Sequence, residues 1–301
     1  MNCEHGVYTK IMDSGDIIKP ALQELKNAPR VEMVAQSIPN EEHPTRNEDS
    51  FFYSQSEGVF AVFDGVSHPA RGDVASRQAK DSVSSELFKS QLRGLSFEEF
   101  TSRVYSSLIK ANESVFARAQ REGEMGTTAS VGAIWEGPGG EKKLLVGNVG
   151  DSRVYIFRTG KLTQVTLDDG IVRGAGKTEE EDRLLQAKFN NVTDLGRDLP
   201  DQFEQRLFLR RNILTQMIGG EKKVIPRLYR VDLKAGDLLL ACSDGISDNL
   251  ADFEIEEILK TSRNLDEGMH QLLFVAQGRS RNEGRELRAK PDDMTGILVK
   301  V

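Results

Sequence analysis

The sequence predicts an α+β fold, because segments with strand and helix periodicity arrive in blocks and not in strict alternation. One block of strand-like segments is followed by two amphipathic helices, and a second block is followed by two more. Each helix pair has an apolar face that a sheet can cover. These observations indicate a layered sandwich of sheets and helices.

The first half of the chain contains the clearest elements. Short runs of β-forming residues, bounded by Pro, Asn and Gly, predict strands at residues 31–36, 51–53 and 59–63. Helices are expected at 73–92 and 97–121, the second with apolar residues three and four apart. Ser96 and Glu99 form the pattern of a capping box at its start. Four further strands in close succession are expected to form an antiparallel meander; they are 127–135, 143–149, 153–157 and 161–166.

The second half is interrupted by residues 169–211, which are polar, charged and only patchily periodic, and which we interpret as an exposed insertion or flap. The elements expected after it are strands at 227–233 and 237–243, helices at 253–260 and 265–277, and a final strand at 294–301. Residues 1–28 have no sustained period and are expected to be an N-terminal extension to one domain, 29–301. Both capture of a partner and disorder are open for this extension.

The composition narrows the class of protein. The formal net charge of the 301 residues is -7, which argues against a broad basic face for nucleic acid. Apolar runs are too short for a membrane span, and the acidic N-terminal segment does not resemble a signal peptide. We therefore expect a cytoplasmic, monomeric protein that binds neither nucleic acid nor membranes. Only Cys3 and Cys242 are present, and Cys242, inside an apolar run, is expected to be a small buried residue.

Carboxylates recur where predicted strands meet loops. Asp64, followed by Gly65, ends the buried run "FAVF", and alone it could be a turn-forming residue or a ligand. The other acids at such junctions are Glu48, Asp49, Asp151, Asp244, Asp248, Asp292 and Asp293. If these ends converge, the carboxylates repel one another unless cations neutralise them. Oxygen ligands without Cys or paired His favour Mg²⁺ or Mn²⁺, and such a cluster suits a two-metal site that activates water at a phosphoryl group.

Motifs along nearly the whole chain resemble those of one known protein family. In order they are "RNEDSFF", "FAVFDGVSH" with "GDVAS", "GTTASVGAIW", "LLVGNVGDSRVYIF", "LTQVTLDD", "LLLACSDGISDNL" and "KPDDMTGILVKV". From about Val31 to Val301 the chain resembles the metal-dependent protein phosphatases, the PPM or protein phosphatase 2C-like enzymes. The resemblance implies a four-layer α-β-β-α sandwich of two antiparallel sheets flanked by helix pairs. It also implies hydrolysis of phosphoserine and phosphothreonine in protein substrates by a water that bridges two Mg²⁺ or Mn²⁺ ions, without a covalent intermediate.

The resemblance also implies roles for individual residues. Asp64 would bridge both metal ions and the Gly65 carbonyl would bind one of them, while Asp49 and Glu48 would act directly or through water. Asp244 and Asp292 match the remaining core ligands, and Asp293 is expected to support them. Asp151 and Asp248, with Asp244, match acids that can hold a third, weaker ion. Gly126, Thr127 and Thr128 are expected mainly to pack in the core.

Two positions depart from the family pattern. The usual phosphate-binding arginine is replaced by Pro44, and Arg46 is either its substitute, as a bidentate phosphate ligand, or a solvated loop arginine. A histidine proposed as general acid in some members is replaced by Val66. His68 could titrate near neutral pH or be a loop residue, and whether His68 or Arg71 faces the metal ions is open.

Three functions are compatible with this sequence. The first is an active phosphatase in which Asp64, Arg46 and Glu48 take part in catalysis. The second is a pseudophosphatase that keeps the fold as a binding module, for which Pro44 is the best support. The third is a metal phosphoesterase that acts on small molecules. The retained acids favour the first function over the second.

Overall fold

The computed structural model describes residues 31–66 and 71–301 and contains two five-stranded antiparallel sheets. The predicted extension at 1–28, Cys3 and His68 lie outside these residues. One sheet has the order β1-β10-β9-β6-β7. Its strands are β1 (Glu32–Ile38), β6 (Arg153–Arg158), β7 (Lys161–Gln164), β9 (Leu238–Cys242) and β10 (Met294–Lys300). The other sheet has the order β2-β3-β4-β5-β8. Its strands are β2 (Ser50–Ser54), β3 (Val59–Phe63), β4 (Ala129–Glu136), β5 (Lys142–Val149) and β8 (Arg227–Asp232).

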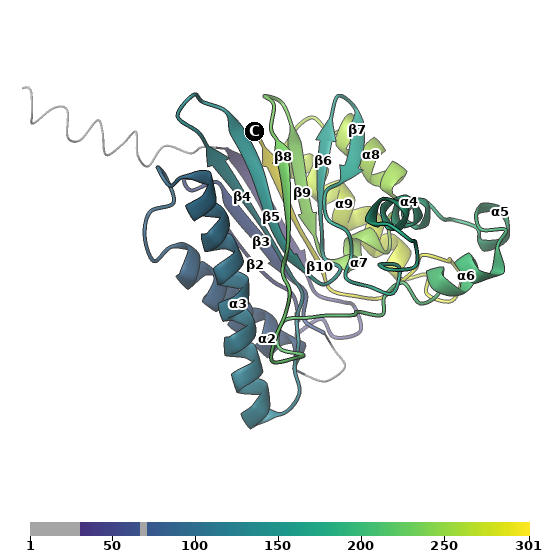
Figure 1. The fold of residues 1–301 in the computed structure, drawn as a ribbon. Coiled ribbons are helices and arrows are strands. Elements are labelled where there is room, and N and C mark those ends of the chain that lie inside the picture. Colours follow the sequence, from purple (N-terminus) through teal and green to yellow (C-terminus); the bar gives the residue numbers. More distant parts are fainter. Residues whose placement is uncertain (1–30, 67–70) are drawn as a thin grey trace, which may run out of the picture.

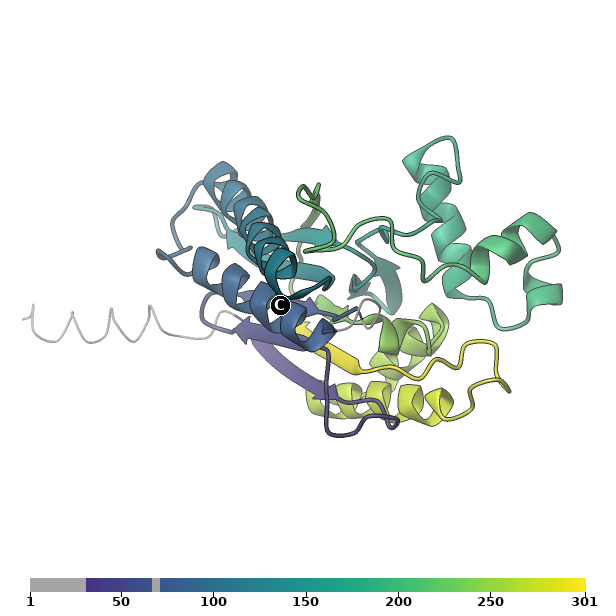
Figure 2. The ribbon, with the colours of Figure 1, turned by 90° about the horizontal axis from the view of Figure 1, so that it is seen from below.

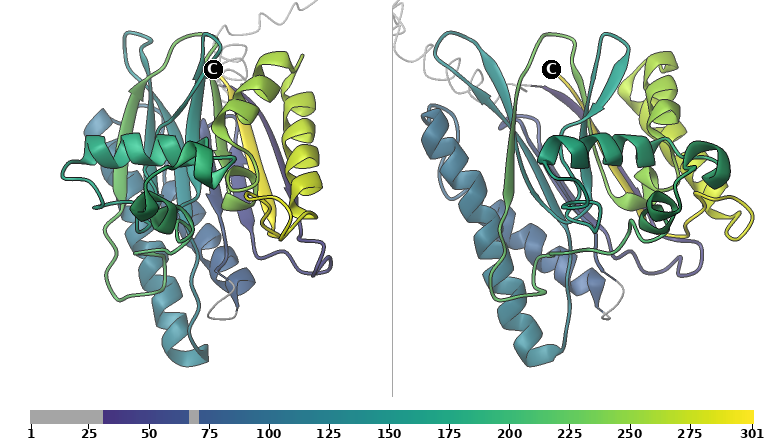
Figure 3. Two further views of the ribbon diagram at one scale, coloured as in Figure 1. Left: turned by 90° about the vertical axis from the view of Figure 1, so that its right-hand side faces the viewer. Right: turned by 45° about the vertical axis from the view of Figure 1, so that its right-hand side comes forward.

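Helices cover the outer faces of both sheets. The pair α2 (Gly72–Leu87) and α3 (Phe97–Glu122) packs on the sheet with β2 to β5 (Figure 1). The pair α8 (Asp252–Thr261) and α9 (Leu265–Ser280) lies on the opposite side, outside the sheet with β1 and β10 (Figure 3, left). The predicted four-layer α-β-β-α sandwich is therefore confirmed.

The position of strand β3 between two layers explains its uninterrupted apolar sequence. Val59, Ala61 and Phe63 point toward α2 and α3, and Phe60 and Val62 point into the core between the two sheets. Both faces of the strand are covered, so every residue of β3 is buried. Cys242 is likewise fully buried, as expected, and burial raises the pKa of its thiol to about 12.

The helices closely follow the predicted ranges. Ser96 and Glu99 form the expected capping box at the start of α3. Helix α2 ends at Leu87, earlier than predicted, and a one-turn helix, α7 (Asp244–Ser247), was not foreseen. In the described part of the chain, no helix combines the length and apolar character needed to cross a membrane.

The predicted meander is wrong in one respect. Strands β4 and β5 pair in one sheet, whereas β6 and β7 pair in the other. The chain changes sheets between Val149 and Arg153, where Gly150 has a φ of 97°. This left-handed conformation suits glycine and redirects the chain across the sandwich. Local strand patterns do not reveal such a change of sheet.

Residues 169–211 form more structure than their charge pattern indicates. They contain α4 (Glu179–Asn190), α5 (Leu195–Asp198) and α6 (Gln202–Phe208). These helices lie on the side of the molecule away from α2 and α3 (Figure 2). Five buried side chains give the segment a small core of its own: Val172, Phe189, Val192, Leu199 and Phe208. The expectation that it is simply exposed is therefore incomplete, because an apolar stripe is present among its charges.

Candidate active site

Antiparallel pairing brings the predicted acids to one end of the sandwich. Phe63, at the end of β3, pairs with Ser50 at the start of β2, so Asp64 adjoins the loop that carries Glu48 and Asp49. In the other sheet, the end of β9 pairs with the start of β10 and with the start of β6. Asp244 and Asp292 thereby become neighbours, and Asp151 lies at the same end.

The backbone of Asp64 is held by two buried threonines. Its N–H donates to Thr128 Oγ1 at 3.0 Å, and its carbonyl accepts from Thr127 Oγ1 and from the Thr128 N–H, each at 2.8 Å. We expected Thr127 and Thr128 mainly to pack in the core. Their hydroxyls instead fix the peptide that presents Asp64, and this contact spans more than 60 residues of sequence.

Gly65 is required by a close backbone approach. A Cβ atom there would lie 2.4 Å from the carbonyl carbon of Gly72 and 2.5 Å from the carbonyl oxygen of Glu48. The φ of Gly65 is not positive, so a special backbone angle is not the reason for glycine. Larger side chains are excluded because the loop after β3 packs directly on the start of α2.

One carboxylate oxygen of Asp49 accepts a hydrogen bond and the other does not. Its Oδ2 atom accepts a 2.7 Å hydrogen bond from Ser243 Oγ, which in turn accepts from the Thr295 N–H. Its buried Oδ1 atom accepts no hydrogen bond from any described residue, and the same holds for Asp244 Oδ1. Unpaired buried carboxylate oxygens are costly, so each is a candidate cation ligand.

Asp293 holds the acidic loop through backbone hydrogen bonds. Its two carboxylate oxygens accept 2.6 Å hydrogen bonds from the N–H groups of Asn40 and Glu48. The Glu48 side chain is almost fully buried and pairs with Arg46, at 2.5 Å between Oε1 and Nη2. Arg46 is half-exposed and lies beside the site.

Burial and mutual repulsion raise the pKa of several of these acids. Burial is the largest cause at Asp64, and Asp244, Asp49, Asp292 and Asp151 raise its pKa further because like charges disfavour ionisation. The pKa of Asp49 and that of Asp151 are also raised, mainly by burial. For Asp244 burial dominates and the pKa rises to about 6.

Lys290 is a member of the site that the sequence did not single out. Its ammonium group forms ion pairs with Asp244, with Asp292 at 3.0 Å and with Asp248 at 3.4 Å. Burial lowers the pKa of Lys290, but these carboxylates outweigh burial and raise it. Its position two residues before Asp292 was the only available signal, and it does not distinguish Lys290 from a solvated lysine.

The donor set fits a hard divalent cation. Carboxylate oxygens are the ligands that Mg²⁺ and Mn²⁺ prefer, and the unpaired oxygens of Asp49 and Asp244 are suitable donors. As arranged, however, no three His, Cys, Asp or Glu side chains within 31–66 and 71–301 could hold a metal ion. Metal binding therefore requires these carboxylates to move closer together.

Arg71 does not face the acids. Its guanidinium donates to the carbonyl and to the carboxylate of Glu122 at 2.8 and 2.7 Å, which ties the start of α2 to the end of α3. His68, the other residue left open, lies outside the described residues.

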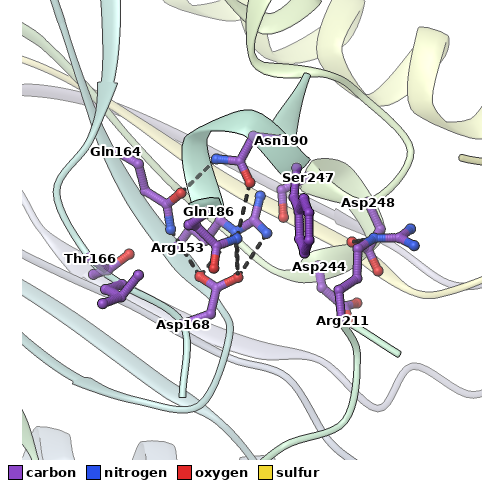
Figure 4. A network of polar contacts seen from close by, with 12 residues as sticks. Arg153, Gln164, Thr166, Asp168, Gln186, Asn190, Arg211, Asp244, Ser247 and Asp248 are labelled. Carbon is purple, nitrogen blue, oxygen red and sulfur yellow. Dashed lines mark hydrogen bonds and ion pairs between the residues drawn. The ribbon is translucent and has the colours of Figure 1, made fainter. Parts of the chain in front are cut away.

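A second polar cluster joins the flap segment to the sheet (Figure 4). Arg153 binds Asp168 through Nε and Nη2 at 2.8–3.1 Å, and Gln186 of α4 donates to the same carboxylate at 3.0 Å. On the other side of the cluster, Arg211 lies 3.4 Å from Asp248. The sequence did not indicate these partners, because they come from distant segments.

Comparisons of the chain with known proteins identify related sequences. A family model described as "Protein phosphatase 2C" matches residues 40–276. The serine/threonine phosphatase stp of Listeria monocytogenes is 30% identical over 263 residues, which cover 84% of this chain and 90% of the relative.

Solved structures show the same fold. The serine/threonine phosphatase Stp1 from Staphylococcus aureus is 25% identical, has a TM-score of 0.68 and matches over 90% of this chain and 95% of its own. The catalytic domain of the phosphatase PstP, in complex with two manganese ions, has a TM-score of 0.65 at 24% identity; the match covers 90% and 97% of the two chains. The chain belongs to the protein phosphatase 2C family.

Proposed function

We propose that this chain is a serine/threonine protein phosphatase that uses two divalent cations, Mg²⁺ or Mn²⁺, held by acids at one end of the sandwich. The observation that carries the proposal is the convergence of acid-bearing loops from both sheets around Asp64, with buried carboxylate oxygens left unpaired. Membership of the family and the phosphatases among its relatives support the same reaction.

In this proposal, some residues bind the metal ions and others bind the substrate. Asp64 and the Gly65 carbonyl, with Asp49, Asp244 and Asp292, would bind the two ions, and Glu48 would act through water. Asp151 and Asp248 complete the acidic set. When bound, the cations lower the pKa of a coordinated water and neutralise phosphoryl charge.

The chain itself orients these groups. Thr127 and Thr128 fix the Asp64 peptide, and Ser243 fixes Asp49. Glu48 holds the Arg46 guanidinium beside the site, where its remaining N–H donors can bind a phosphate. The phosphoryl group would pass directly to water, and a phosphorylated protein would be the substrate.

The test is Mn²⁺-dependent hydrolysis of a phosphothreonine peptide by the full chain, compared with Asp64→Asn. We expect the variant to lose at least about a thousandfold in kcat/KM, because a carboxylate that would hold the ions is removed. A wild-type rate no higher than that of the variant would instead support a pseudophosphatase. Faster hydrolysis of free phosphorylated metabolites than of the peptide would support a small-molecule phosphoesterase.

A further inference from the structure

The backbone of Lys290 is anchored beside the acidic site. Its backbone N–H donates to Asn249 Oδ1 at 3.0 Å, and Asn249 Nδ2 donates to the Lys290 carbonyl at 2.8 Å. The same amide also donates to the Gly245 carbonyl at 2.8 Å, so a fully buried asparagine clamps Lys290 to α7. The clamp places the ammonium group between Asp244, Asp248 and Asp292.

Asp248 lies within ion-pair distance of two side-chain cations. Besides Lys290 at 3.4 Å, Arg211 Nε lies 3.4 Å from Asp248 Oδ1. Asp248 itself is almost fully buried, so water screens these charges only weakly. A divalent cation bound beside Asp248 would meet the ammonium of Lys290 and the guanidinium of Arg211, and like charges at such distances inside a protein repel one another strongly.

Asp64 and Asp49 differ from Asp248 in this respect. Among the described residues, no Lys or Arg side chain forms an ion pair with either carboxylate. Asp248, by contrast, lies 3.4 Å from both Lys290 and Arg211.

We propose that Lys290, assisted by Arg211, is an internal cation that takes the place of a third metal ion at Asp151, Asp244 and Asp248. This inference rests on the proposed metal centre. The centre then holds two divalent cations, and the third, weaker ion suggested by the family resemblance is not bound. Lys290 acts as a positioning residue, because it fixes the carboxylates of Asp244 and Asp292.

The experiment counts Mn²⁺ ions bound per chain by equilibrium dialysis and metal analysis, at Mn²⁺ concentrations up to several millimolar. We expect two ions for the wild type and three for Lys290→Met, which keeps the length of the side chain but removes its charge. Lys290→Arg keeps the charge and should bind two. Lys161→Met, at a lysine whose side chain is 78% exposed, is the matched control and should also bind two.

A double variant locates the additional ion. Lys290→Met combined with Asp248→Asn should return the count to two, because a ligand of the third ion is removed. Three ions in the wild type, or two in a Lys290→Met protein that retains the wild-type thermal transition, would overturn the inference. The wild-type count does not depend on any variant folding. A wild type that binds no Mn²⁺ and hydrolyses nothing would overturn the metal centre itself.

Discussion

Arg46 and Glu48 form an ion pair at the edge of the site. Glu48 Oε1 accepts from one guanidinium nitrogen of Arg46 at 2.5 Å, while about half of the Arg46 side chain is exposed. Arginine has five N–H donors, so donors remain for a phosphate oxygen. Asp293 fixes this loop through the Glu48 N–H. The shifted position of Arg46 relative to Pro44 is therefore compatible with a phosphate contact.

Replacing Arg46 tests this role directly. We expect Arg46→Ala to lower kcat/KM for a phosphothreonine peptide by about 10- to 100-fold, because a charged hydrogen bond contributes roughly 1.5–3 kcal/mol. Arg46→Lys should recover part of the loss. Arg77→Ala, at another exposed arginine paired with an acid, serves as the control. An unchanged kcat/KM in Arg46→Ala would make Arg46 a loop residue.

At the scale of elements, buried arginine side chains link the flap segment, residues 169–211, to the rest of the molecule by hydrogen bonds. Arg288 donates to the carbonyls of Phe189 and Val192 in the flap segment, at 3.2 and 3.3 Å. It also donates to the carbonyls of Ser247 and Leu250 at 2.7 and 3.2 Å. One buried guanidinium thus joins α4 to the turn that carries Asp248. The position of the flap and the geometry of the acids are therefore physically connected.

Removing the hydrogen bonds of Arg288 should increase the mobility of the flap segment. We expect Arg288→Met to leave buried carbonyls without donors, to lower the free energy of unfolding by about 2–4 kcal/mol, and to increase amide hydrogen exchange in α4. Exchange in α3 should remain unchanged at the same denaturant concentration. Arg285→Met, at an exposed arginine of the same loop, is the control. Equal exchange in α4 of both variants would contradict this role of Arg288.

At the scale of the whole molecule, the sandwich collects more negative charge at one end than its own cations neutralise. The raised pKa of Asp64, Asp49, Asp151 and Asp244 means that the folded, metal-free protein binds protons more readily than the unfolded chain. An unfolded aspartate titrates near pH 3.9. The resulting penalty is absent below about pH 4 and grows as pH rises through the folded pKa values, which for Asp244 is about 6.

Thermal unfolding measures this penalty. We expect the Tm of the metal-free protein to fall by several degrees between pH 5.5 and pH 8, and the fall to shrink when Mn²⁺ is bound. Asp64→Asn, also metal-free, should show a smaller fall and a higher Tm at pH 8. His43, whose pKa is also raised, adds to the trend, so His43→Gln is the control and should keep most of it. A Tm that does not fall with rising pH in the metal-free wild type would contradict this account.

Much of the architecture follows from local patterns. The apolar run of β3, the capping box of Ser96 and Glu99, and the period of α3 are each encoded within a few residues, so their elements could be predicted. The acids at strand ends were also visible. Their roles as metal ligands remain a proposal.

Only the tertiary structure decides which side chains and backbone groups come into contact. The change of sheet at Gly150, the threonines that hold Asp64 and the cations around Asp248 depend on pairing between distant segments. In the sequence, Lys290 and Arg211 do not differ from other charged loop residues, because the residues next to them do not show which acids they contact. The sequence by itself determined the strands, the two helix pairs that cover the sheets and the acids, since periodicity and turn chemistry are local. The fold decided which acids already have a protein cation, because electrostatic pairing depends on distance in space and not on separation along the chain.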